Sequence, residues 1–143
     1  MTADIRPCRL EECPEVLHLW TAAEADPTVT DTLEDVERLV RENGDLFLVA
    51  EHDASVVGTV IATWDGWRGH IYRLAVRPAF RRMGIGRALI REAERRLVAR
   101  GSRRIVCLVL HEDAQAVAFW DALRNEGYER NTRAVRYIKT SRS

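Results

Sequence analysis

The sequence has 143 residues, of which 46% are hydrophobic and 31% are charged. This length suits one domain that buries about two thirds of its unfolded surface, and the composition is too apolar for a disordered chain. No apolar run approaches the roughly 18 residues that cross a bilayer, and the first residues lack the apolar centre of a signal peptide. We therefore expect a single cytoplasmic domain, residues 1–143, with no membrane segment.

Charge is divided unevenly along the chain, although 22 acidic and 22 basic residues leave no net charge. Residues 1–67 contain 15 Asp and Glu against 4 Arg, whereas residues 68–143 contain 7 acids against 18 bases. This division favours one anionic and one cationic ligand, or two solvated faces that attract each other. The three cysteines are widely spaced and have no histidine pair nearby, so we expect reduced thiols and no metal site.

The acidic half predicts two helices after a short strand at residues 5–8. Apolar residues recur at helical spacing over residues 11–25 and again over residues 33–43. Thr32 and Asp35 resemble a capping box at the start of the second helix.

The remaining chain mixes strands with two further helices. Apolar and β-branched runs predict strands at residues 46–50, 56–63, 71–76, 105–110 and 135–139, and helical spacing predicts helices at residues 84–100 and 113–126. The run at 105–110 has the continuous apolar character of a strand buried on both faces. It follows the helix at 84–100 closely, which indicates a strand–helix–strand unit.

The most informative stretch runs from Leu74 to Ala88, where a strand ends, a basic loop follows and two glycines open a helix. Amides at a helix N-terminus lack partners, and Gly84 and Gly86 let a phosphate approach them without a Cβ in the way. Charge-assisted hydrogen bonds to the same anion are available from three arginines, Arg81, Arg82 and Arg87. The stretch therefore favours a pyrophosphate ligand.

Two common nucleotide loops fit this stretch poorly. A Walker A loop needs Gly-Lys-Ser/Thr, which is absent. A dinucleotide fold places Gly-x-Gly-x-x-Gly directly after its first strand, but here Leu89 stands at the third glycine position and seven residues follow Val76 before Gly84.

The motif Arg81-Arg82-Met83-Gly84-Ile85-Gly86 resembles the acetyl-CoA loop, Arg/Gln-x-x-Gly-x-Gly/Ala, of the GNAT family of N-acetyltransferases. The similarity to small single-domain bacterial members extends over nearly the whole chain. It implies an α/β fold with a mixed sheet of six to seven strands, splayed between the fourth and fifth strands and flanked by about four helices. It also implies acetyl-CoA as cosubstrate, an amine acceptor and a homodimer.

The resemblance assigns the cofactor to two parts of the chain. Main-chain groups of the strand before the loop would bind pantetheine, and the loop amides would bind pyrophosphate. A later helix normally carries Asn-x-x-Ala-x-x-Phe-Tyr, which reads Asp113 to Trp120 here. The implied cofactor residues are Leu74, Ala75, Val76, Arg81, Arg82, Met83, Gly84, Ile85, Gly86, Arg87, Ala88, Asp113, Ala116, Phe119 and Trp120.

Acetyl transfer to an amine needs a base for the ammonium proton and usually an acid for the departing thiolate. In the family the base often lies at the start of the strand before the loop, where this chain has His70, with Tyr72 on the same strand face. Four acids are the other candidates for the base, Asp26, Asp31, Glu34 and Asp65. Trp120 replaces the usual tyrosine acid, so Tyr72, Tyr128 or unassisted departure of the thiolate remain open.

The acidic half predicts a cationic acceptor, framed by tryptophan faces. The candidate acceptor residues are Asp26, Asp31, Trp64, Asp65 and Trp67. The missing tyrosine keeps open a CoA-binding regulatory module with little or no catalysis. A nucleic-acid patch over the arginine-rich residues 81–104 is a further alternative, which the acidic half disfavours.

Overall fold

The computed structural model describes residues 3–141. The chain divides into two compact units, residues 1–107 and residues 108–143. Among the described residues, no helix combines the length and the apolar character that crossing a membrane requires.

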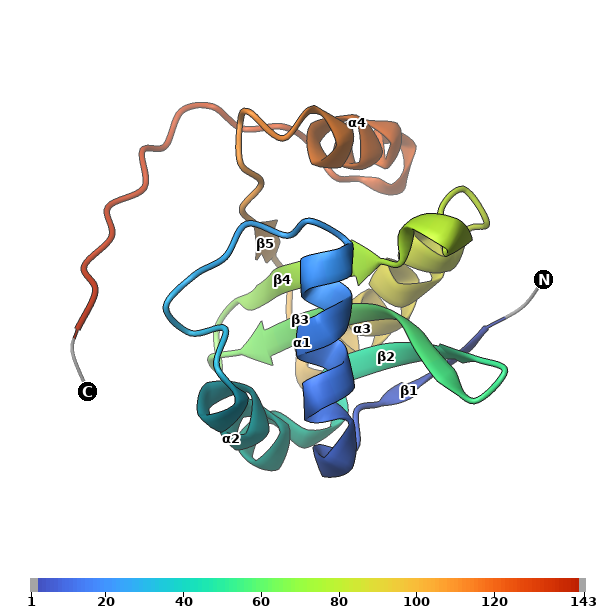
Figure 1. The fold of residues 1–143 in the computed structure, drawn as a ribbon. Coiled ribbons are helices and arrows are strands. Elements are labelled where there is room, and N and C mark those ends of the chain that lie inside the picture. Colours follow the sequence, from blue (N-terminus) through green and yellow to red (C-terminus); the bar gives the residue numbers. More distant parts are fainter. Residues whose placement is uncertain (1–2, 142–143) are drawn as a thin grey trace. The chain divides into compact units, whose positions relative to one another are not determined.

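The first unit is built on a five-stranded mixed sheet (Figure 1). Its strands follow one another in the order β1 (Asp4–Pro7), β2 (Phe47–His52), β3 (Ser55–Trp64), β4 (Gly69–Val76) and β5 (Ile105–Cys107). The first four strands pair antiparallel, and β5 pairs parallel with β4. The parallel pairing covers only Gly69 to Ile71 of β4, so the two strands part soon after they begin.

Three helices belong to this unit: α1 (Cys13–Ala22), α2 (Leu33–Asn43) and α3 (Ile85–Arg100). Figure 1 shows α1 on one face of the sheet and α3 on the opposite face. The hydroxyl of Thr32 accepts the Asp35 N–H at 3.2 Å, which confirms the predicted N-cap of α2. The helix α3 ends at Gly101, whose φ of 107° suits glycine.

The central strand β3 lies within the hydrophobic core because helices cover both of its faces. Trp20 of α1 stacks on Phe47, with ring centroids 6.5 Å apart, and both side chains are buried. On the other face, Leu89 and Leu97 of α3 are fully buried. This two-sided burial fits the β-branched and apolar sequence of β3.

Gly58 lets α3 approach β3 closely. A Cβ on Gly58 would lie 3.1 Å from Leu89 Cδ1, 3.2 Å from Ile85 Cγ2 and 3.3 Å from Ala75 O. We expect Gly58→Ala to lower the free energy of unfolding by about 1–2 kcal/mol, because the helix must shift to admit the methyl group. Urea denaturation measures this. Ser55→Ala, at the exposed end of the same strand, is the control and should change it by less than about 0.5 kcal/mol. Equal effects of the two variants would contradict close packing at Gly58.

The second unit contains α4 (Ala114–Ala122) and a short 3-10 turn, Arg124–Glu126. The Asp113 carboxylate caps α4 by accepting the Ala116 N–H at 3.0 Å. Trp120 packs edge-on against Phe119 and Tyr128, with ring centroids 5.6 and 5.2 Å away. Leu123, which follows α4 directly, is buried.

The predicted strand at residues 135–139 is wrong, because the structure has no strand there. Val135, Tyr137 and Ile138 are 78%, 93% and 68% exposed. A strand needs a neighbouring backbone for its N–H and C=O groups, and none pairs with residues 129–140 within the described chain. The strand predicted at 105–110 is also shorter, ending at Cys107. The described sheet therefore has five strands rather than the expected six to seven.

Candidate functional site

The loop between β4 and α3 turns the chain sharply into the start of the helix. Pro78 to Phe80 form a short 3-10 turn after β4 ends at Val76. Arg82 then adopts a φ of 64° and Gly84 a φ of 81°. Two left-handed residues so close together turn the chain sharply, and α3 begins at Ile85.

The first turn of α3 offers main-chain donors. The Ala88 N–H is bonded to the Gly84 carbonyl at 3.0 Å, which closes the first turn. The amides of Ile85, Gly86 and Arg87 precede that bond and have no carbonyl within the helix to bind. With the positive end of the helix dipole, they form the kind of N-terminus that binds anions.

The three loop arginines have different surroundings. Arg82 and Arg87 are exposed beside the first turn of α3. Arg81 is half-buried and donates from Nε to the Val76 carbonyl at 3.3 Å and from Nη2 to the Ala23 carbonyl at 3.1 Å. Arg81 therefore joins the loop to the end of α1.

The edge of β4 next to the loop has an unusual pairing. On one side, Ala75 and Val76 pair with β3, opposite Thr59 and Gly58. On the other side, β5 reaches no farther than Ile71, and no other strand among the described residues pairs with that edge. The segment with Leu74, Ala75 and Val76 thus has a backbone edge of the kind that accepts an extended ligand.

His70 and Tyr72 lie on the same face of β4, as their spacing predicts. Their rings stack with centroids 6.2 Å apart and planes inclined by 19°. His70 is half-buried and Tyr72 is 45% exposed. The structure therefore brings the two predicted proton-handling residues together.

The two predicted acids between α1 and α2 have unequal roles. The Asp26 side chain is exposed. The Asp31 carboxylate accepts a hydrogen bond from Nη2 of Arg73, and only 19% of its side chain is exposed. The sequence does not predict Arg73 as a site residue. Its sequence context is an ordinary strand, and nothing local indicates a partner 42 residues away.

Among the three predicted residues at the turn between β3 and β4, Asp65 stabilises the turn itself. The Asp65 carboxylate accepts the N–H groups of Trp67 at 2.8 Å and Arg68 at 2.7 Å. These bonds, that of Arg68 above all, lower the pKa of the Asp65 carboxyl. Trp67 is 71% exposed, and the Arg68 guanidinium lies 4.0 Å from its ring centroid. Trp64 is half-buried at the end of β3.

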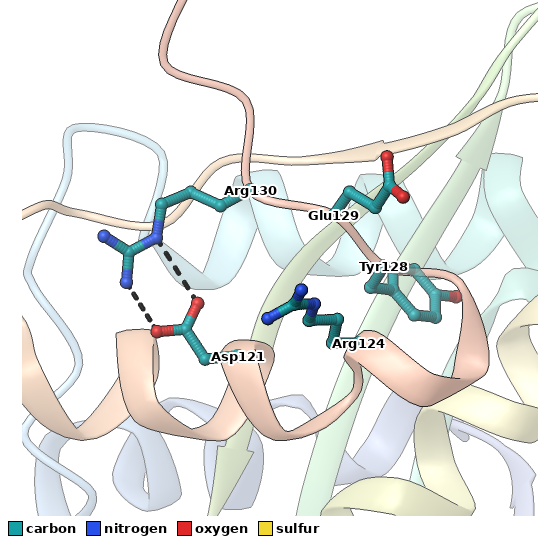
Figure 2. Close-up of a pocket in the computed structure, with 5 residues that line it drawn as sticks. All are labelled: Asp121, Arg124, Tyr128, Glu129 and Arg130. Atoms are coloured by element: carbon teal, nitrogen blue, oxygen red, sulfur yellow. Dashed lines mark hydrogen bonds and ion pairs between the residues drawn. The ribbon is translucent and has the colours of Figure 1, made fainter.

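The predicted residues of the second unit surround α4. Asp113 caps the helix, while Phe119, Trp120 and Tyr128 pack on one another. Tyr128 also lines a hollow with Asp121, Arg124, Glu129 and Arg130, and Figure 2 shows its hydroxyl directed away from the Asp121–Arg130 ion pair. The contacts of Tyr128 with Trp120 fit a packing role.

The cysteines are poorly suited to nucleophilic chemistry. Burial raises the pKa of Cys8 to about 12 and that of Cys107 to about 11. Cys13 is fully buried, and burial raises its pKa too. All three are free thiols and stay protonated near neutral pH.

Comparison with known proteins identifies the family of the chain and similar folds. Residues 10–124 match the family described as the acetyltransferase (GNAT) family. An acetyltransferase of Photorhabdus laumondii is 37% identical over 136 residues, which cover 95% of this chain and 94% of that protein.

Solved structures resemble the fold at lower identity. Ard1 from Thermoplasma volcanium has a TM-score of 0.77 and 22% identity, over 85% of this chain and 81% of that chain. The PaiA N-acetyltransferase from Thermoplasma acidophilum, solved in complex with coenzyme A, has a TM-score of 0.72 and 18% identity, over 85% of this chain and 88% of that chain.

Proposed function

Because the chain belongs to the GNAT family of acetyltransferases, we propose that it acetylates a primary amine of a small molecule, a peptide or a protein. Acetyl-CoA, the acetyl donor of this family, is the cosubstrate. We further propose that residues 1–143 form one acetyltransferase domain. In support, the family match spans residues 10–124 and so continues across the boundary between the two units.

The start of α3 carries the proposal. It combines the first-turn amides of α3, which have no carbonyl within the helix to bind, with two exposed arginines, Arg82 and Arg87. A diphosphate needs this combination of donors and positive charge. The main chain of Leu74 and Val76 would hold the pantetheine arm, and Asp113, Ala116, Phe119 and Trp120 are the further cofactor residues that the family pattern suggests.

Acetyl-CoA supplies a thioester whose carbonyl the acceptor amine attacks directly, with release of the CoA thiol. The protonated cysteines argue against an acetyl-cysteine intermediate. His70 takes the proton from the ammonium group, directly or through water. Tyr72, whose ring stacks on that of His70, is the first candidate acid for the leaving thiolate, and Tyr128 is the second.

The acceptor is proposed to be cationic because acidic residues dominate the first 67 positions. Asp26, Trp64 and Trp67 are its candidate contacts. Family resemblance also suggests a cytoplasmic homodimer, which light scattering coupled to size-exclusion chromatography would test for the oligomeric state.

The test is acetyl-CoA-dependent release of free thiol by the purified chain, with polyamines, amino acids, aminoglycosides and peptides as acceptors. Release that requires one acceptor class supports the proposal and identifies the acceptor. CoA binding by calorimetry with no release for any acceptor would instead favour a CoA-binding regulatory module, the alternative that Trp120 suggests. Absence of CoA binding by folded protein would contradict both.

Trp120→Phe should reduce acetyl transfer by less than about threefold. An indole N–H donates a hydrogen bond but is not a usable acid, and phenylalanine keeps the ring that packs on Phe119 and Tyr128. Steady-state kinetics with saturating acetyl-CoA measure the effect. A collapse of turnover with folding and CoA binding intact would show that Trp120 has a direct role.

A further inference from the structure

Arg73 has a strained backbone at an irregular point of β4. Thr59 pairs with Ala75 and Ile61 with Tyr72, so two residues of β4, Arg73 and Leu74, lie opposite a single residue of β3. This is a β-bulge, and Arg73 has a φ of 51° within it. A non-glycine residue keeps such a conformation only where its surroundings hold it.

Contacts hold Arg73 at both its backbone and its side chain. Its carbonyl accepts the hydroxyl of the fully buried Thr59 at 3.1 Å, and that hydroxyl accepts the Trp20 indole N–H at 2.9 Å. The guanidinium Nη2 donates to the Asp26 carbonyl at 2.7 Å and to the Asp31 carboxylate. Its Cζ lies 5.2 Å from the centroid of the Trp20 ring. One residue therefore links the bulge to the segment between α1 and α2.

Asp31 organises that segment from its other end. Its carboxylate accepts the N–H and the hydroxyl of Thr28, at 3.1 and 3.2 Å, while its own N–H donates to the Thr28 carbonyl at 3.2 Å. The side chains of Asp31 and Arg73 are only 19% and 17% exposed. A pair so shielded from water is screened less than a surface pair, and removing one partner leaves the other poorly solvated.

The start of the same segment is held by the anion-binding loop. The Ala23 carbonyl, just after α1, accepts a hydrogen bond from Arg81 at 3.1 Å. Arg73 and Arg81 thus fasten residues 23–31 on either side of Leu74 to Val76, the stretch that we assign to pantetheine. The position of the segment depends on the strand that would hold the acetyl donor.

We propose that Arg73 and Asp31 form a latch that positions residues 23–31 over the β4 bulge, as the wall of the acceptor site beside the acetyl group. This inference rests on the proposed function. Arg73 is a positioning residue, and its guanidinium already neutralises Asp31. The charge of a cationic acceptor is therefore met by the exposed Asp26, and Asp31 serves the latch.

The latch can be tested without turnover, by hydrogen exchange on the full chain. Asparagine tolerates a left-handed backbone, so Arg73→Asn preserves the bulge but is too short to reach Asp31. We expect the Thr28 and Asp31 amides to exchange at least about tenfold faster in this variant. Arg38→Gln is the matched control, because it removes an exposed arginine that pairs with Glu34 and Asp35 on α2. Unchanged exchange in folded Arg73→Asn would overturn the latch.

Kinetics then separate positioning from general damage. Using the acceptor found by thiol release, Arg73→Asn should raise the acceptor KM by about tenfold while the Kd for CoA changes by less than about twofold. Arg73→Lys should recover part of the loss, since lysine restores the charge but lacks the guanidinium fork. An unchanged acceptor KM, or a parallel loss of CoA affinity, would contradict the proposal.

A second variant and the exchange measurement distinguish failure of the latch from failure of the proposed function. If Arg73→Asn does not fold, Asp31→Asn leaves the bulge untouched and removes the charge of the latch, so the same exchange and KM shifts are expected from it. If the unaltered protein releases no thiol with any acceptor, the proposed function fails, whereas the exchange result still decides whether Arg73 holds the segment.

Discussion

Arg87→Glu is expected to raise the Kd for CoA by about 30- to 100-fold, equivalent to about 2–3 kcal/mol, while the protein stays folded. Arg87 is exposed in the first turn of α3, beside the amides that we assign to the diphosphate. The change removes a charge-assisted hydrogen bond and adds repulsion at the same point. A glutamate in the first turn interacts favourably with the helix dipole, so thermal stability should not fall. Isothermal titration calorimetry measures the affinity.

Arg91→Glu is the matched control, with the same charge reversal one turn later on an exposed position of α3. It should weaken CoA binding by less than about threefold, because Arg91 lies beyond the first-turn amides and would affect the diphosphate only through exposed, solvent-screened charge, without a direct hydrogen bond. Acetyl-pantetheine, which lacks the diphosphate, provides a second control, and Arg87→Glu should not weaken its binding. Equal losses for both variants would indicate only general electrostatic attraction, and no loss for Arg87→Glu would place the diphosphate elsewhere.

His70→Gln should reduce kcat by about 100-fold or more, within the range of general-base catalysis. His70 is half-buried on β4 and stacks on Tyr72, in the strand that leads to the cofactor loop. Glutamine retains a polar side chain that forms hydrogen bonds but does not take up the amine proton. The Kd for CoA should change by less than about twofold, because the assigned cofactor contacts begin at Leu74.

His18→Gln is the control for this variant, since His18 is exposed on α1. Its kcat should remain within about twofold of the unaltered protein. A normal kcat for His70→Gln would indicate that a carboxylate is the base, and Asp26 is the first candidate because it is exposed whereas Asp31 is bound by Arg73. Tyr72→Phe, measured beside it, reports whether the neighbouring phenol contributes the second proton transfer.

The order and type of most elements follow from local patterns. Helical spacing and a capping threonine predict α2, and glycine ends α3 where the apolar stripe stops. Strand lengths are less predictable because they depend on pairing. Residues 105–110 are apolar throughout, yet only Ile105 to Cys107 find a backbone partner in β4. Residues 135–139 have strand-like composition but no partner within the described chain.

The candidate site residues also fall into those that local sequence predicts and those that depend on distant partners. Arg82, Gly84, Gly86 and Arg87 are close in sequence, so their spacing predicts a helix N-terminus with its arginines. The roles of the acidic residues do not follow from local sequence, because the availability of each carboxylate depends on distant partners. Asp31 and Asp26 look alike in the sequence, but only the Asp31 carboxylate is taken up by an arginine from β4.

The sequence by itself indicated the family resemblance, the helix N-terminus with its arginines and the position of His70 and Tyr72 on one strand face, because these depend on neighbours a few residues apart. Tertiary structure alone decided the bulge at Arg73 and the binding of Arg81 to the end of α1. A bulge arises from the register between two strands, and these side-chain contacts join residues more than 40 positions apart. No local pattern encodes such distances, so the folded chain was needed to distinguish the acid that binds Arg73, Asp31, from the acid that stays exposed, Asp26.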